Sequence, residues 1–394
     1  MHIAFTDDML ALRDELRTYF ASLVTEAERS SKDIFGRDRL MEIFGTLGRD
    51  GWLGIGWPVE YGGQGRSDLE QFVFFDEAKR AGVPIPMLAL NTVGPTLMAY
   101  GTEEQKQRYL PAILRGEIDF AIGYTEPAAG TDLAALKTRA VRDGDEYVID
   151  GNKIFTTGGA VSDYIWLAAR TDPDAPKHKS LSIFIVPTDT PGFDVTPLPT
   201  IAEDGARATT STYYSNVRVP VTNRVGAENE GWKLITTQLN HERVALAASR
   251  GWILGLAEEV GEWAATAEAP GGGRLIDVDW VRHTLAHVDA RLEAMKLFNW
   301  RMVALVNGGG VLTAHDAAVS KVYGTEMLIE ATTDLLEVLG HAGSLRTGSP
   351  AAVLSGRVES AYRGAVVGTF GGGNNDMLLE MISTSALGMT RAKR

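Results

Sequence analysis

The hydrophobic pattern of this chain changes its period twice, which restricts the architectures that the chain can form. Apolar residues first keep a roughly helical spacing between glycine and proline breakers, then follow the pattern of short strands, and return to long helical patterns from Gly231. The length of 394 residues also exceeds one compact core. We therefore expect an α+β protein with an N-terminal helical domain over 1–119, a middle β domain over 120–225 and a C-terminal four-helix bundle over 226–394.

Turn signals divide the middle region. Asp143-Gly144 predicts one hairpin, and Asp150-Gly151-Asn152, before Ile154–Thr157, predicts a second. Together with three later β-rich runs, they predict a small antiparallel sheet or barrel. The three runs are Tyr164–Ala169, Leu181–Val186 and Ser211–Val219, and the helices expected after them are Trp232–Trp263, Asp279–Val306, Ala314–Leu339 and Ala351–Gly368.

Composition excludes several classes of function. With 51 acidic and 38 basic residues the formal charge is −13, so nucleic acid and anionic membrane surfaces are poor partners. The chain has no cysteine, and its seven histidines show no metal-ligand spacing, so we expect no metal site. Asp7 and Asp8 stand where a signal peptide would be basic and then apolar, and no apolar run is long enough for a membrane span. These features favour a cytoplasmic protein.

The segment Gly123–Leu136, reading GYTEPAAGTDLAAL, has little that suits packing alone. It gathers backbone N–H groups and hydroxyls with almost no bulk, which suits a chain running against a flat, hydrogen-bonding cofactor. The alternative is an ordinary loop in which Thr131 or Asp132 caps the next element. The segment by itself does not decide between these two interpretations.

Four segments together resemble the acyl-CoA dehydrogenase family, and the likeness covers nearly the whole chain. They are Gly48–Gly65 (GRDGWLGIGWPVEYGGQG), Tyr100–Glu117 (YGTEEQKQRYLPAILRGE), the segment Gly123–Leu136 and Asp150–Gly159 (DGNKIFTTGG). Within the family, the chain is most similar to actinobacterial enzymes that degrade steroid side chains as CoA thioesters. The resemblance implies FAD as cofactor, an acyl-CoA substrate, and electron-transfer flavoprotein or a similar acceptor.

The resemblance also implies roles for individual residues. Thr125 would face the flavin ring, Gly130 and Thr131 the ribityl or phosphate groups, and Thr157 flavin N5, while Phe155 stands where the family usually has Trp. Burial in the core is the alternative for Phe155, although the two glycines after Thr157 favour close backbone approach. The full set of expected cofactor-binding residues is Tyr124, Thr125, Gly130, Thr131, Phe155, Thr156, Thr157, Gly372, Gly373 and Asn375.

The family's usual catalytic base is absent, because Gly371 occupies the position of that glutamate. A second group in the family places the base on a C-terminal-domain helix, and the matching residue in QLNHERVALA is Glu242. Glu242 also falls on one helical face with the apolar Ile235, Leu239 and Leu246, where desolvation would raise its pKa toward that of a general base. The alternative is a structural ion pair with Arg243 or Arg250.

The substrate site follows from the same likeness. Replacing the acid by Gly371 opens volume for a bulky acyl group, steroid-type or branched. Asn240 and Arg243 match positions that contact the CoA part, and Thr131 is also expected to touch the substrate. The reaction implied is removal of an α-proton by Glu242 with hydride transfer from Cβ to flavin N5.

The residues that the family lends to a neighbouring subunit have changed. The Arg-x-x-Phe-Gly loop is shortened around Gly271–Asp279, and Glu337 replaces a glutamine that would lie near the pyrophosphate. We therefore expect a heterotetramer with a paralogous subunit. The alternative is a homo-oligomer in which Arg274 supplies the missing cation. Two further alternatives are a non-catalytic partner subunit and a flavoprotein that performs oxygen chemistry.

Overall fold

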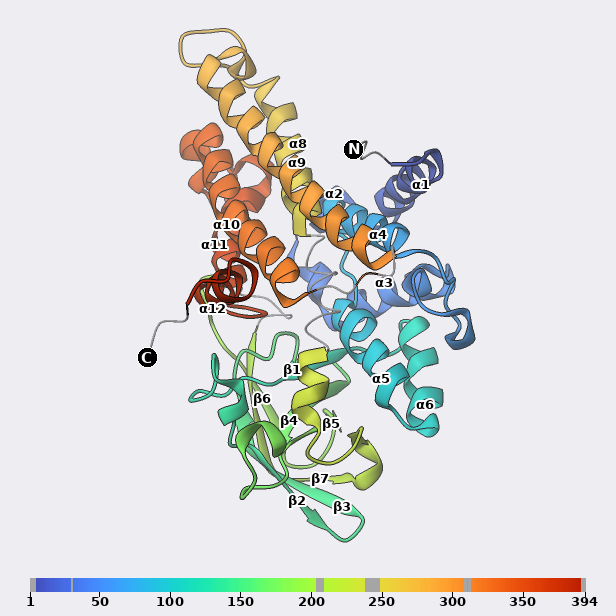
Figure 1. Cartoon of the computed structure of the whole chain (residues 1–394). Coiled ribbons are helices and arrows are strands. Elements are labelled where there is room, and N and C mark those ends of the chain that lie inside the picture. The colour runs from blue at the N-terminus through green and yellow to red at the C-terminus, as the bar shows by residue number, and fades with distance from the viewer. Residues whose placement is uncertain are drawn as a thin grey trace. The chain divides into compact units, whose positions relative to one another are not determined.

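The computed structural model describes residues 5–29, 31–202, 209–237, 249–307, 310 and 313–390 (Figure 1). The chain divides into two compact units, and neither is one continuous segment. One unit comprises Met1–Ser31, Arg66–Val83 and Arg243–Arg394, and the other comprises Lys32–Gly65 and Pro84–Glu242. No helix among the described residues is long and apolar enough to cross a membrane.

The described residues of the second unit form an eight-stranded sheet. Seven strands follow the order β6-β7-β3-β2-β4-β5-β8, and β1 pairs with β4 outside that path. The expected antiparallel pairing holds for five of the described strand pairs, whereas β1 with β4 and β2 with β4 are parallel, so the sheet is mixed. The strand bounds are β1 Phe120–Gly123, β2 Arg139–Asp143, β3 Glu146–Lys153, β4 Tyr164–Arg170, β5 Leu181–Pro187, β6 Phe193–Pro197, β7 Thr210–Pro220 and β8 Arg224–Val225.

The two predicted turns had different outcomes. Asp143-Gly144 does close the β2–β3 hairpin, with Asp143 paired to Glu146. The second predicted hairpin was wrong, because β3 continues through Gly151, and its pairing with β7 shifts register between Ile149 and Gly151. A Cβ on Gly151 would lie 2.5 Å from Thr138 Oγ1. The glycine therefore permits a close approach inside a strand and forms no turn.

Alternate residues along the strands are buried, and these residues form the core beneath the sheet. Tyr147 and Ile149 of β3 point inward with Ile165 and Leu167 of β4, and they pack with Val217 of β7. The helices of the same unit are α3 Arg37–Arg49, α5 Gly94–Tyr100 and α6 Glu103–Leu114, and residues 231–237 are also helical. Thr102 begins α6 with a reciprocal capping box to Gln105.

The first unit is helical. Its buried apolar core comes mainly from α8, α9, α10 and α11, with α4 packed against α1 and α8. The predicted helix over Ala351–Gly368 begins only at Arg357, because Leu354 and Ser355 have positive φ and cannot continue a helix. The helix bounds are α1 Asp7–Leu23, α2 Glu26–Arg29, α4 Asp68–Arg80, α8 Ser249–Ala264, α9 Asp279–Asn307, α10 Ala314–Leu339, α11 Arg357–Ala365 and α12 Asn375–Met381.

Candidate functional site

The loop after β1 makes a tight turn around Pro127. The backbone N–H of Glu126 donates to the Ala129 carbonyl at 3.1 Å, and that of Ala129 donates to the Glu126 carbonyl at 3.0 Å. This turn leaves Gly130 and Thr131 exposed and Thr125 half-buried. The loop therefore presents small polar groups to the surrounding space, as its composition predicts.

The segment after β3 holds Phe155 in an unusual state. Its φ is +60°, and its side chain is 53% exposed. A bulky residue at positive φ is strained, and an exposed aromatic ring gains little from folding. Such a combination is typical of a position kept for contact with a ligand. Phe155 is therefore not part of the core of this unit, which was the alternative interpretation.

A backbone hydrogen bond joins the two segments. The N–H of Ile154 donates to the Thr125 carbonyl at 2.9 Å, and a Cβ on Gly130 would lie 3.9 Å from Thr125 Cγ2. Thr125, Gly130 and the residue preceding Phe155 are therefore neighbours. The structure brings together the two segments that sequence similarity associates with one flavin.

In the sheet-containing unit, the expected cofactor-binding residues Tyr124 and Thr156 are buried. The Tyr124 hydroxyl accepts a hydrogen bond from Trp166 Nε1 at 3.0 Å. Thr156 lies inside the protein with its N–H and carbonyl paired to Thr210, while the neighbouring Thr157 is exposed. Thr156 Oγ1 is buried and has no hydrogen-bond partner among the described residues.

The glycine segment of the other unit lies between two short helices. Gly371, Gly372 and Gly373 are exposed, and the last two have φ of +67° and +113°. The side chain of Asn375 is engaged inside the unit, where its Oδ1 accepts from Lys321 Nζ at 2.7 Å. Lys321 Nζ also donates to the Gly373 carbonyl, and burial lowers the pKa of Lys321 to about 8. A buried cation thus holds the end of this glycine segment.

The expected base and the CoA-binding residues lie outside the described residues. These are Asn240, Glu242 and Arg243. Arg250, one of the two alternative ion-pair partners for Glu242, donates to Asp76 Oδ2 at 2.6 Å. Burial raises the pKa of Asp76 to about 6, although the attraction of Arg250 opposes that rise.

Replacing Arg250 by methionine (R250M) should destabilise the protein by about 3–5 kcal/mol, because it leaves the Asp76 carboxylate buried and unpaired. Urea unfolding would measure this loss. The control is R282M, which removes an exposed pair with Asp279 and should cost about 0–1 kcal/mol. Equal, small losses in both variants would contradict a structural role for the buried pair.

The two positions expected to serve a neighbouring subunit are both exposed. Arg274 makes a bidentate pair with Asp277, at 2.8 Å from Nε and 3.0 Å from a terminal nitrogen. Its charge is thus already matched by an acid three residues away. Glu337 near the end of α10 is exposed.

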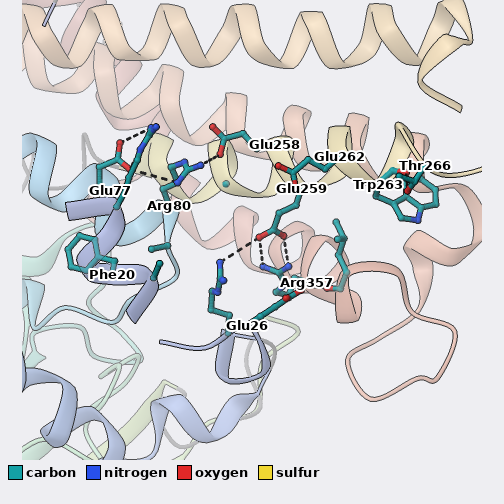
Figure 2. A pocket seen from close by; sticks show the side chains of 16 residues that line it. Phe20, Glu26, Glu77, Arg80, Glu258, Glu259, Glu262, Trp263, Thr266 and Arg357 are labelled. Atoms are coloured by element: carbon teal, nitrogen blue, oxygen red, sulfur yellow. Dashed lines mark hydrogen bonds and ion pairs between the residues drawn. The ribbon is translucent and has the colours of Figure 1, made fainter. Parts of the chain in front are cut away.

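A recess of about 520 Å³ in the helical unit is lined by four arginines and five glutamates. Figure 2 shows that these side chains pair with one another: Arg80 contacts Glu77 and Glu258, and Arg357 contacts Glu259. No described residue of the predicted site lines this recess. Its charges are used in joining α1, α4, α8 and α11.

Sequence patterns did not identify three buried residues that hold the candidate site: Lys153, Glu126 and Lys321. Lys153 shares the inward face of β3 with Tyr147 and Ile149. A charged residue on the apolar face of a strand was the signal that could have identified it.

Comparison with known proteins places this geometry in a family. Three family models match the chain: the N-terminal domain of acyl-CoA dehydrogenase over residues 6–117, its middle domain over 121–217 and its C-terminal domain over 229–387. The chain belongs to the acyl-CoA dehydrogenase family. The expected order of helical, sheet and helical domains is therefore confirmed, while the bounds 1–119, 120–225 and 226–394 stay a prediction.

Individual relatives are similar over their full length. Acyl-CoA dehydrogenases FadE26 and FadE29 of Mycobacterium tuberculosis are 51% and 46% identical, with all of this chain and all of each relative covered. A chain of the Tcur3481-Tcur3483 steroid ACAD has a TM-score of 0.93 at 54% identity, and one of the ChsE4-ChsE5 complex from M. tuberculosis has 0.92 at 51%; both cover all of either chain.

Members of this family are FAD-dependent acyl-CoA dehydrogenases, and the described residues fit FAD. The exposed Phe155 ring at positive φ offers a flat apolar contact, and the open loop at Gly130 and Thr131 offers N–H and hydroxyl donors without bulk. Thr156 Oγ1, which is buried and has no hydrogen-bond partner in the described part of the chain, adds a further hydroxyl within the same segment. These are the features that a hydrogen-bonding, planar group requires.

Proposed function

We propose that this acyl-CoA dehydrogenase binds FAD against Thr125, Gly130, Thr131, Phe155 and Thr157 and acts on a bulky, steroid-type or branched acyl-CoA. The exposed, strained Phe155 beside Thr125 is the observation that carries the proposal. An aromatic ring on one side and threonine hydroxyls nearby would orient the isoalloxazine. When bound, FAD supplies the acceptor for the hydride that leaves Cβ.

Glu242 is proposed as the base that takes the α-proton. Ile235, seven residues earlier on the predicted face, is 1% exposed in the helical stretch 231–237. Helical spacing would place Leu239, Glu242 and Leu246 on that same apolar side. A carboxyl group in such surroundings has a raised pKa, which suits proton abstraction near neutral pH. Asn240 and Arg243 are proposed to contact the CoA part.

A bulky acyl group is supported by two observations. Gly371 is exposed and stands in place of the family's usual glutamate, so this position itself contributes no side chain. In addition, one of the most similar structures is named a steroid ACAD. Together they favour a large, rigid acyl group over a short linear one.

Substituting Gly371 by glutamate (G371E) should lower activity on the best bulky substrate and should not produce a conventional enzyme for it. A Cβ at Gly371 would already lie 3.1 Å from the Val367 carbonyl oxygen. In the proposed site, the longer side chain would take volume that the acyl group needs. Steady-state kinetics with large and small acyl-CoAs measure the effect, and unchanged activity on the large one would place Gly371 away from the acyl chain.

The proposed assembly is a heterotetramer with a paralogous subunit, and electron-transfer flavoprotein or a similar protein is the proposed electron acceptor. The similar Tcur3481-Tcur3483 and ChsE4-ChsE5 proteins are named as pairs of chains. In this chain, Glu337 would repel a pyrophosphate, and the exposed Arg274 is paired with Asp277. A second type of subunit with a free arginine would supply the missing cation.

Screening the co-expressed pair against a panel of acyl-CoAs, with an artificial electron acceptor, tests this function. We expect turnover that is greatest with steroid-type or branched acyl groups. Flavin-containing protein that oxidises none of them would instead favour a non-catalytic subunit. Preference for short linear acyl groups would contradict the role proposed for Gly371.

A further inference from the structure

A buried ion pair links the two segments of the proposed flavin site. Lys153 is 0% exposed and Glu126 is 7% exposed, and Lys153 Nζ lies 2.9 Å from Glu126 Oε1. The same ammonium group donates to the Tyr124 carbonyl at 3.1 Å. Lys153 ends β3 two residues before Phe155, whereas Tyr124 and Glu126 flank Thr125. One side chain therefore spans both segments.

Glu126 in turn closes the loop that carries Gly130 and Thr131. Its Oε2 accepts from the Lys137 N–H at 2.6 Å, and its Oε1 accepts from the Thr138 N–H at 2.8 Å. Both carboxylate oxygens are thus used, and the loop is fixed at its beginning and at its end. Such charge-assisted bonds have well-defined directions.

The charges of Lys153 and Glu126 are consistent with residues that fix the positions of their neighbours. Burial lowers the pKa of Lys153 to about 8. Burial alone would raise the pKa of Glu126, but the attraction of Lys153 and the hydrogen bonds from Thr138 bring it below its usual value. A buried ion pair is often no more stabilising than apolar residues of the same volume. Its presence here is better explained by the positions that it fixes.

We propose that Lys153 and Glu126 are positioning residues that set Thr125 and the Gly130–Thr131 loop relative to Phe155, and thereby the affinity and electronic environment of the bound flavin. This inference rests on the proposed flavin site. Neither residue needs to touch the flavin, because each acts through the backbone that it holds.

The test compares K153M, E126Q and the double variant K153M/E126Q with the wild type, each co-expressed with the paralogous subunit. The control K106M removes a lysine from the exposed pair with Glu103 on α6. FAD affinity, the visible spectrum of bound flavin and its reduction potential are measured. We expect FAD affinity to fall by about 10–100-fold, the range found for outer partners of metal sites, with a changed spectrum and potential. K106M should match the wild type.

The double variant keeps the test decisive if a single variant does not fold, because it removes both charges and leaves neither unpaired. A folded variant with wild-type FAD affinity, spectrum and potential would overturn the inference, even if its stability were reduced. A wild-type complex, co-expressed with the paralogous subunit, that holds no FAD would instead refute the proposed flavin site. The two failures are therefore distinguishable.

Discussion

Replacing Glu242 by glutamine (E242Q) is expected to lower kcat by more than about 10²-fold, the low end for loss of a general base. The amide keeps the shape of the side chain but cannot accept the α-proton. FAD should stay bound and the fold should be unchanged, because none of the proposed flavin contacts involves Glu242. Single-turnover reduction of the flavin by acyl-CoA would measure the loss at the chemical step itself.

A matched control separates loss of the base from general disturbance of that region. Glu230, an exposed glutamate just before the helical stretch 231–237, can be replaced in the same way (E230Q), and this variant should stay within a few-fold of wild type. Activity of E242Q close to that of E230Q would remove Glu242 from the mechanism. A structural ion pair would then be the preferred interpretation of Glu242.

The second large effect concerns flavin content. Expressed alone, this chain is expected to hold FAD poorly, since the pyrophosphate would meet Glu337 and an Arg274 already paired with Asp277. Co-expressed with a paralog that carries the missing arginine, it should give a yellow complex with about half as many flavins as chains, as two unlike subunits sharing each site would require. Flavin absorbance against total protein measures this ratio.

One result would contradict the shared site. A homo-oligomer purified with one tightly bound FAD per subunit would show that the chain completes its own site. Variant R274M then identifies the cation: its flavin loss would assign Arg274 to the pyrophosphate, while unchanged binding would assign that role elsewhere.

Much of the architecture could be predicted from hydrophobic period and turn chemistry. The helical ranges 279–306 and 314–339 closely match α9 and α10, and Asp143-Gly144 does close a hairpin. The errors have local causes. Gly151 is indistinguishable in sequence from a turn glycine, although it accommodates Thr138 within a strand. The positive φ of Leu354 and Ser355, which delays α11, follows no residue preference.

The candidate site was predicted unevenly. Residues that the structure exposes, such as Thr131, Phe155 and Thr157, were found through similarity to family segments. The buried residues that hold them were not found, because Lys153 and Glu126 are far apart in sequence and meet only through the pairing of folded segments. The spacing of residues along the sequence does not predict contacts of this kind. Glu242 lies outside the described residues and stays a prediction.

Anaerobic mixing of the co-expressed, flavin-containing complex with a bulky acyl-CoA would show whether this protein dehydrogenates such substrates. We expect the visible absorbance of the oxidised flavin to disappear within the first turnover, short linear acyl-CoAs to reduce the flavin far more slowly, and E242Q to prevent the change. A yellow complex whose flavin no acyl-CoA reduces would contradict this expectation.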